Sequence, residues 1–140
     1  GVSVRARLSG AAAAVRAAAA NIGGEFDLGG DSFWQDLREQ RLPFFQRPGN
    51  LWRVTTAPAA TQPELAGAWL IDWGGAQRWL KTAESADSVH RACAASAARA
   101  TLFRGDGSPN RAPLTPELAA LQQRVRNAFD PLGVFATYPD

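Results

Sequence analysis

The sequence predicts an α+β domain in which helices pack on one face of an antiparallel sheet, and three observations support this. Five segments have strand-like patterns and four have helical ones, in the order β-α-α-β-β-β-α-β-α. Strands therefore outnumber the helices that could connect parallel neighbours, which favours antiparallel pairing. A length of 140 residues with 46% hydrophobic composition fits one domain, residues 1–140.

The first segments predict a strand followed by a helix. Residues 2–8 alternate apolar and polar side chains, which is typical of a half-buried strand. Ser9 is a candidate N-cap for a helix over residues 11–22, and Gly23 with Gly24 would end that helix.

A second helix is predicted from Ser32, with Gln35 three residues later in the position of a capping box. Pro43 would end it, because the residue before proline avoids the helical region. The side chains expected to face the core are Phe33, Trp34 and Leu37.

Four further strands and two helices follow. The strands are predicted at residues 51–56, 67–73, 77–82 and 99–104, with a hairpin turn at Gly74-Gly75. One helix runs from Ser85 to about Ala98, and its small inner face consists of Val89, Ala92, Cys93 and Ser96. The last helix starts at Thr115-Pro116-Glu117 and closes at Asp130-Pro131, with apolar side chains at helical spacing: Leu118, Leu121, Val125 and Ala128.

Strand alternation places several cationic side chains on the sheet face that helices leave uncovered. These are Arg5, Arg7, Arg53, Lys81 and Arg99, with Trp79 among them. Arginine binds carboxylates through two parallel hydrogen bonds, so the face is a candidate platform for an anion. The alternative is a solvated face on which arginine stems cover apolar surface. Lys81 is the one lysine among 15 basic residues, a bias that either anion binding or a GC-rich coding sequence explains.

Other chemistry-bearing residues favour structural roles. His90, the one histidine, has no nearby nucleophile or metal-ligand partner in the sequence. Cys93, the one cysteine, excludes an internal disulfide and fits a small core residue. Gly74-Gly75 lacks the GxGxxG spacing of a dinucleotide loop, so a tight hairpin is the better interpretation. No catalytic residue and no metal site are predicted.

Three stretches carry a family resemblance. They are Phe33–Gln40 continuing through Leu42-Pro43-Phe44-Phe45 to Leu51-Trp52-Arg53, then Leu70–Lys81, and finally Phe129-Asp130-Pro131-Leu132-Gly133-Val134-Phe135. Together they resemble the E-subunit family of bacterial glycolate oxidases, within the FAD-linked oxidases of the vanillyl-alcohol-oxidase type. The resemblance covers essentially the whole chain. It implies the C-terminal cap domain, ferredoxin-like in fold, of a longer subunit whose N-terminal FAD-binding domain is absent here.

The resemblance also implies an assembly. Family members contain FAD in the full-length protein, with none expected on this fragment alone, which would be inactive by itself. They work with a larger FAD-binding subunit and an iron–sulfur subunit to oxidise glycolate, or a related 2-hydroxy acid, to the 2-oxo acid. The expected location is the cytoplasm, at the inner face of the cytoplasmic membrane only through the complex.

Caps of this family turn their open sheet face toward flavin and substrate, so the residues expected to lie there are Arg53, Trp79, Arg99 and Thr101. The chain departs from the family twice. Arg99 stands where the family has the histidine of Gly-Gly-His-Ala-Thr, and an arginine cannot act as an acid–base group. The family's Asn-Pro-Gly-Arg tail is replaced after Phe135 by residues 136–140.

Two alternatives come from other classes. A structural role, in which the cap docks the other subunits without catalysis, is favoured by the changed tail and the missing histidine. A basic sheet with an aromatic residue also resembles an RNA-binding surface. The expected aromatic pair on neighbouring strands is absent, however, and the net charge is only +2, so no nucleic-acid partner is predicted.

Overall fold

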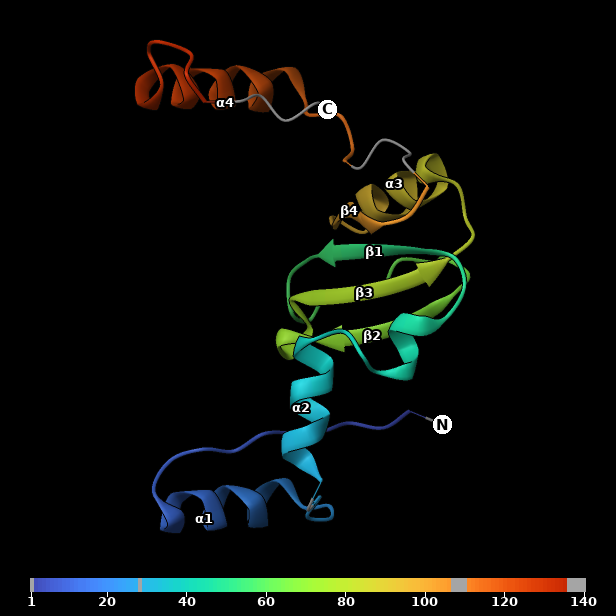
Figure 1. Ribbon diagram of the computed structural model, residues 1–140, viewed down its shortest axis with the longest axis vertical. Coiled ribbons are helices and arrows are strands. Elements are labelled where there is room, and N and C mark those ends of the chain that lie inside the picture. The colour runs from blue at the N-terminus through green and yellow to red at the C-terminus, as the bar shows by residue number, and fades with distance from the viewer. Residues whose placement is uncertain (1, 28, 107–110, 136–140) are drawn as a thin grey trace. The chain divides into compact units, whose positions relative to one another are not determined.

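The computed structural model describes residues 2–27, 29–106 and 111–135 and divides into two compact units, Gly1–Leu42 and Pro43–Asp140 (Figure 1). That residues 1–140 act as one cap domain stays a prediction.

The first unit contains two helices, α1 (Ala12–Ile22) and α2 (Gly30–Arg38), and the strand predicted over residues 2–8 is wrong. Val2 and Val4 are 97% and 90% exposed, so the alternating pattern has no buried side. Side-chain contacts hold this segment instead. The Arg5 guanidinium pairs with Asp27 and lies 4.1 Å from the centre of the Phe33 ring. Arg5 and Arg7 consequently do not belong to a sheet face, because alternation creates a strand only where a neighbouring strand pairs with it.

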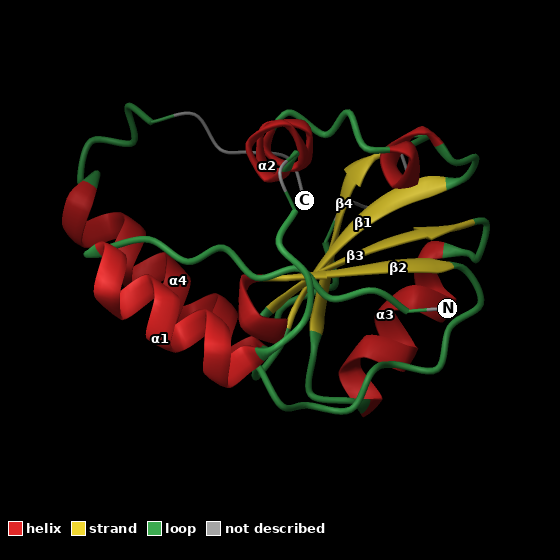
Figure 2. Cartoon of the chain, turned by 90° about the horizontal axis from the view of Figure 1, so that it is seen from below, coloured by secondary structure: helices red, strands yellow, loops and turns green. Residues whose placement is uncertain are grey.

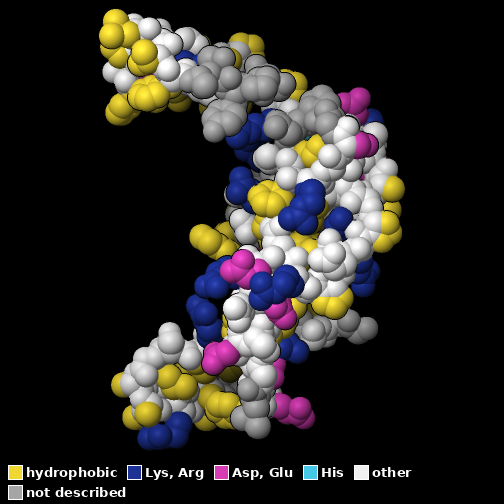
Figure 3. Space-filling view, in the orientation of Figure 1, with side chains coloured by type: hydrophobic (Ala, Val, Ile, Leu, Met, Phe, Trp, Pro, Cys, Tyr) yellow, Lys and Arg dark blue, Asp and Glu magenta, His cyan; other side chains and the backbone are white. Residues whose placement is uncertain are grey.

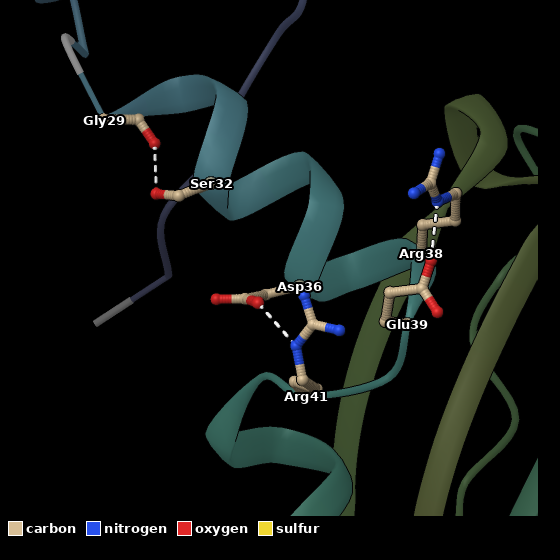
Figure 4. A network of polar contacts seen from close by, with 6 residues as sticks. All are labelled: Gly29, Ser32, Asp36, Arg38, Glu39 and Arg41. Atoms are coloured by element: carbon tan, nitrogen blue, oxygen red, sulfur yellow. Dashed lines mark hydrogen bonds and ion pairs between the residues drawn. The ribbon is translucent and has the colours of Figure 1, made fainter.

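The N-caps of both helices in this unit differ from the predicted ones. Ala11, not Ser9, is the N-cap of α1, whereas Gly23 ends the helix at a φ of 72°, as predicted. Helix α2 starts before Ser32, whose hydroxyl donates to the Gly29 carbonyl at 2.8 Å (Figure 4). The Asp27 carboxylate accepts from the Gly29 N–H and takes the place of the predicted capping box.

Helix α2 ends at Arg38, five residues before Pro43. Gln40 adopts a φ of 54°, which stops the helix, and the Arg41 N–H groups reach back to Asp36 (Figure 4). The predicted inner residues of this helix are half-buried, and none is fully buried: Phe33, Trp34 and Leu37.

The second unit contains a four-stranded antiparallel sheet, which confirms the predicted α+β class. Its strands are β1 (Asn50–Thr55), β2 (Ala68–Asp72), β3 (Gln77–Thr82) and β4 (Arg99–Arg104), in the order β2-β3-β1-β4. The predicted hairpin joins β2 and β3 through the 3₁₀ turn η2 (Trp73–Gly75). The strands fan out with the twist of the sheet (Figure 2).

The crossover between β3 and β4 is helical, while that between β1 and β2 is a loop. A ferredoxin-like fold has a helix in both crossovers, so this finer assignment stays a prediction. The helical crossover, α3 (Ala86–Ala95), has its N-terminus capped by Ser85, whose hydroxyl accepts from the Ser88 N–H at 3.2 Å. Val89 and Cys93 of α3 pack against the sheet and form the core with Trp52, Val54, Leu80, Ala98 and Ala100.

The last helix, α4 (Pro116–Phe129), starts as predicted, with the Thr115 hydroxyl accepting from the Leu118 N–H. Both carboxylate oxygens of Asp130 accept backbone N–H groups, from Val134 and Phe135 at 2.8 Å each, and close the segment. The apolar stripe of α4 is roughly half exposed, with Leu118, Leu121 and Val125 at 44%, 47% and 49%. No helix in the described ranges combines the length and the apolar character that a bilayer crossing requires.

Candidate functional site

Strand register brings the four predicted site residues to one face of the sheet, opposite α3. Arg53 on β1 lies between Trp79 on β3 and Thr101 on β4, all three in one row. Arg99 lies in the next row, opposite Thr55. The predicted placement of Arg53, Lys81 and Arg99 on one face is therefore confirmed, and their role toward a ligand stays a prediction.

Part of this face is covered, contrary to expectation. The 3₁₀ turn η1 (Pro43–Gln46) brings Phe45 to 5.8 Å from the Trp79 ring, which also meets Phe103 at 5.1 Å, and both pairs are edge-to-face. Trp79 is consequently only 7% exposed. We call Phe44, Phe45, Trp79 and Phe103 the aromatic cluster. The Trp79 and Phe103 rings contact each other across β1, and Leu51 on the same face of β1 is fully buried.

The cationic side chains beyond the aromatic cluster are open to solvent. Arg53 and Arg99 are exposed, and neither has an acidic partner within the described parts of the chain. Lys81 differs, since its ammonium donates to the Gly49 carbonyl at 2.9 Å. Burial and the charge of Arg104 lower the pKa of Lys81. Lys and Arg side chains lie beside hydrophobic ones over the sheet (Figure 3). The two arginines are thus the groups best placed to bind an anion.

One further cation, Arg111, lies at this face and was not predicted. Arg111 forms an isolated antiparallel bridge with Thr101 at the β4 edge, and its side chain is exposed. It follows a Gly/Pro/Asn loop and has no strand pattern around it. No signal in the local sequence identifies such a bridge, because it depends on a tertiary contact between Arg111 and the edge of β4.

His90 and Cys93 lie on α3, on the other side of the sheet from the arginines. Burial lowers the pKa of His90, against an opposing effect of the Asp87 charge, and the ring packs edge-on against Trp52 at 5.3 Å. Burial raises the pKa of Cys93 to about 11, so its thiol is neutral at pH 7. Cys93 is a core residue, as predicted. Across the described residues, no three His, Cys, Asp or Glu side chains are grouped in a way that could hold a metal ion.

The Gly74-Gly75 turn does not fit the pyrophosphate of FAD. A Cβ on Gly75 would lie 2.4 Å from the Pro58 carbonyl oxygen, so protein backbone already fills that side of the turn. The buried Arg78 guanidinium donates to the Gly75 and Ala60 carbonyls at 3.1 and 2.6 Å, and these bonds hold the loop in place. The turn is therefore structural.

These features define an α+β domain that presents an arginine-bearing sheet face beside an aromatic cluster, of which Phe45 and Trp79 are buried. Over 130 residues, the chain is 45% identical to the glycolate oxidase subunit GlcE of Escherichia coli (strain K12). The match covers 92% of this chain and 36% of that subunit, so the chain spans about a third of its relative. The chain is related to a C-terminal domain of this subunit, which confirms the family resemblance. No family model and no solved structure matches.

Proposed function

We propose that this chain is the cap domain of a glycolate-oxidase subunit and that Arg53 and Arg99 bind the carboxylate of glycolate or a related 2-hydroxy acid. The observation that carries the proposal is the pair of exposed guanidiniums in adjacent rows of one sheet face, without acidic partners in the described chain. The relationship to a glycolate oxidase subunit supports the substrate class.

The chain's own residues would bind and orient the substrate. Each guanidinium can donate two parallel hydrogen bonds to a carboxylate, which sets the direction of the ligand as well as its affinity. The aromatic cluster stiffens the sheet beneath, since its rings are packed edge-to-face. If another part of the full-length protein covered this face, it would exclude water and strengthen the attraction between the guanidiniums and the carboxylate. FAD belongs to this proposal for the full-length protein alone, where it would accept the electrons of the oxidation.

Substitution in the full-length assembled oxidase tests the proposal. We expect Arg53→Gln and Arg99→Gln each to raise the KM for glycolate by about 10- to 100-fold, as loss of a charge-assisted hydrogen bond predicts. The turnover number should change little, because binding is lost equally in ground and transition states. Arg91→Gln on α3 is the matched control, since it removes an exposed arginine from the opposite side of the sheet. Wild-type KM values in both Arg53→Gln and Arg99→Gln would refute the proposal.

A second candidate function is docking of the other oxidase subunits, the larger flavin subunit and the iron–sulfur subunit. The half-exposed apolar stripe on α4 favours it, because contiguous exposed apolar side chains often mark protein contacts. Co-purification of the oxidase subunits with a Leu118→Gln/Leu121→Gln variant tests this candidate. Loss of co-purification with unchanged KM for glycolate in the residual complex would support docking, and unchanged co-purification would count against it.

A further inference from the structure

Arg111 lies in the same row of the sheet as Arg53. An antiparallel bridge pairs Arg111 with Thr101, and Thr101 pairs on its other side with Arg53. Directly opposed residues in an antiparallel pair place their side chains on the same face. Neighbouring strands are about 4.8 Å apart, so Arg53 and Arg111 flank Thr101 at about one strand spacing each.

We infer that Arg53, Thr101 and Arg111 form a single carboxylate-binding site, with one guanidinium on each side of the threonine hydroxyl. This inference deepens the proposed function and rests on it. It adds Arg111 to the substrate-binding residues, while Arg99, one row away, attracts the same anion from outside this shared contact.

The two positive charges in this row favour an anionic ligand. Arg53 and Arg111 are both exposed and carry positive charge, and the salt bridges of the described residues include neither of them. Two like charges flanking one residue repel each other, and an anion between them removes that repulsion. Two guanidiniums present up to four N–H groups to two carboxylate oxygens, which matches the acceptor capacity of one carboxylate.

The half-buried Thr101 hydroxyl completes the site. It lies between the two arginines and can donate or accept a hydrogen bond. A 2-hydroxy acid carries its hydroxyl one carbon from the carboxylate, so a hydroxyl partner beside the carboxylate contacts suits that ligand class.

A double-mutant cycle in the full-length assembled oxidase tests the inference. Arg111→Gln should raise the KM for glycolate about 10- to 100-fold with little change in turnover number. The double variant Arg53→Gln/Arg111→Gln should raise KM by much less than the product of the single effects, since both groups contact one carboxylate. Arg99→Gln combined with Arg111→Gln should be closer to multiplicative. Arg111→Lys keeps the charge and should recover part of the affinity.

The outcomes separate the two proposals. Wild-type KM for Arg111→Gln alongside a raised KM for Arg53→Gln would overturn the shared site and leave the proposed function standing. Multiplicative effects of Arg53→Gln and Arg111→Gln would also overturn it, because independent sites add in free energy. Wild-type KM for all three arginine variants would refute the proposed function itself. Arg91→Gln serves as the control, and thermal unfolding of each variant verifies its fold.

Discussion

Arg53 on β1 lies directly opposite Trp79 on β3, so an exposed guanidinium and a buried indole share one face of the sheet. The indole is packed between Phe45 and Phe103, whereas the guanidinium is open to solvent. One face therefore divides into an aromatic part that stabilises the fold and a cationic part that is available for a ligand. The two parts should respond differently to substitution.

Removing the indole should destabilise the sheet without touching its charge. Trp79→Ala is expected to lower the free energy of unfolding by about 3–5 kcal/mol, because it empties a buried aromatic position between two rings. Trp73→Ala is the control, since Trp73 is 77% exposed and should change the free energy by about 0.5 kcal/mol or less. Chemical denaturation of both variants measures the difference. Equal effects would contradict the packing role of Trp79.

Two adjacent glycines should respond differently to alanine. Gly75→Ala places a Cβ 2.4 Å from the Pro58 carbonyl oxygen at a φ of +99°. We therefore expect its free energy of unfolding to fall by well over about 1 kcal/mol, and by more than that of Gly74→Ala. Gly74→Ala meets nothing within 4 Å and incurs only the strain of a φ of +60°, about 1–2 kcal/mol. Thermal unfolding compares the two. A larger effect at Gly74 would show that the turn is not packed against Pro58.

The stability of the fold should fall at acidic pH through His90. Burial lowers the folded-state pKa of His90 below its ordinary value of 6.5, so the unfolded chain binds the proton more readily. The contribution of neutral His90 to the free energy of unfolding is then fully present above pH 6.5, and it is lost as the pH falls through the folded-state pKa. Denaturation at a series of pH values should show a slope in that window, and His90→Gln should reduce it. An unchanged slope in the variant would assign the effect to other groups.

Cys93 should be unreactive in the folded state. Its pKa of about 11 leaves almost no thiolate at pH 7, and its side chain is buried in the core. A thiol reagent should modify the native protein far more slowly than the protein in denaturant. Rapid modification of the native protein would contradict the packing of α3 on the sheet.

Strands with a buried side and a glycine turn were predictable, and the segment around residues 2–8 was not. The bounds of β3 and β4 agree with the predicted ranges, and Ser85 caps α3 as expected. Residues 2–8 alternate just as regularly, yet Arg5 and Arg7 contact aromatic rings of α2 and no strand forms. Local periodicity indicates which residues could share a face, but a strand forms only where a neighbouring strand lies close enough to pair with it.

The candidate site, likewise, was predictable from the sequence only in part. Alternation along each strand is enough to assign Arg53, Arg99 and Thr101 to one face, because a period of two residues fixes the sides within a strand. The cover over Trp79 depends on the position of η1, and the bridge of Arg111 depends on its meeting the edge of β4 in the folded chain. Such tertiary contacts leave no periodic pattern in the chain. The replaced tail, residues 136–140, lies outside the described residues.

The central claim is that the exposed arginines recognise the negative charge of the substrate. Its most direct test compares glycolate with its neutral amide as substrates of the full-length assembled oxidase, in the wild type and in Arg53→Gln. The wild type should prefer glycolate, and Arg53→Gln should lower kcat/KM for glycolate about 10- to 100-fold while leaving that for the amide nearly unchanged. An equal loss for both substrates, or none for either, would contradict charge recognition by this face.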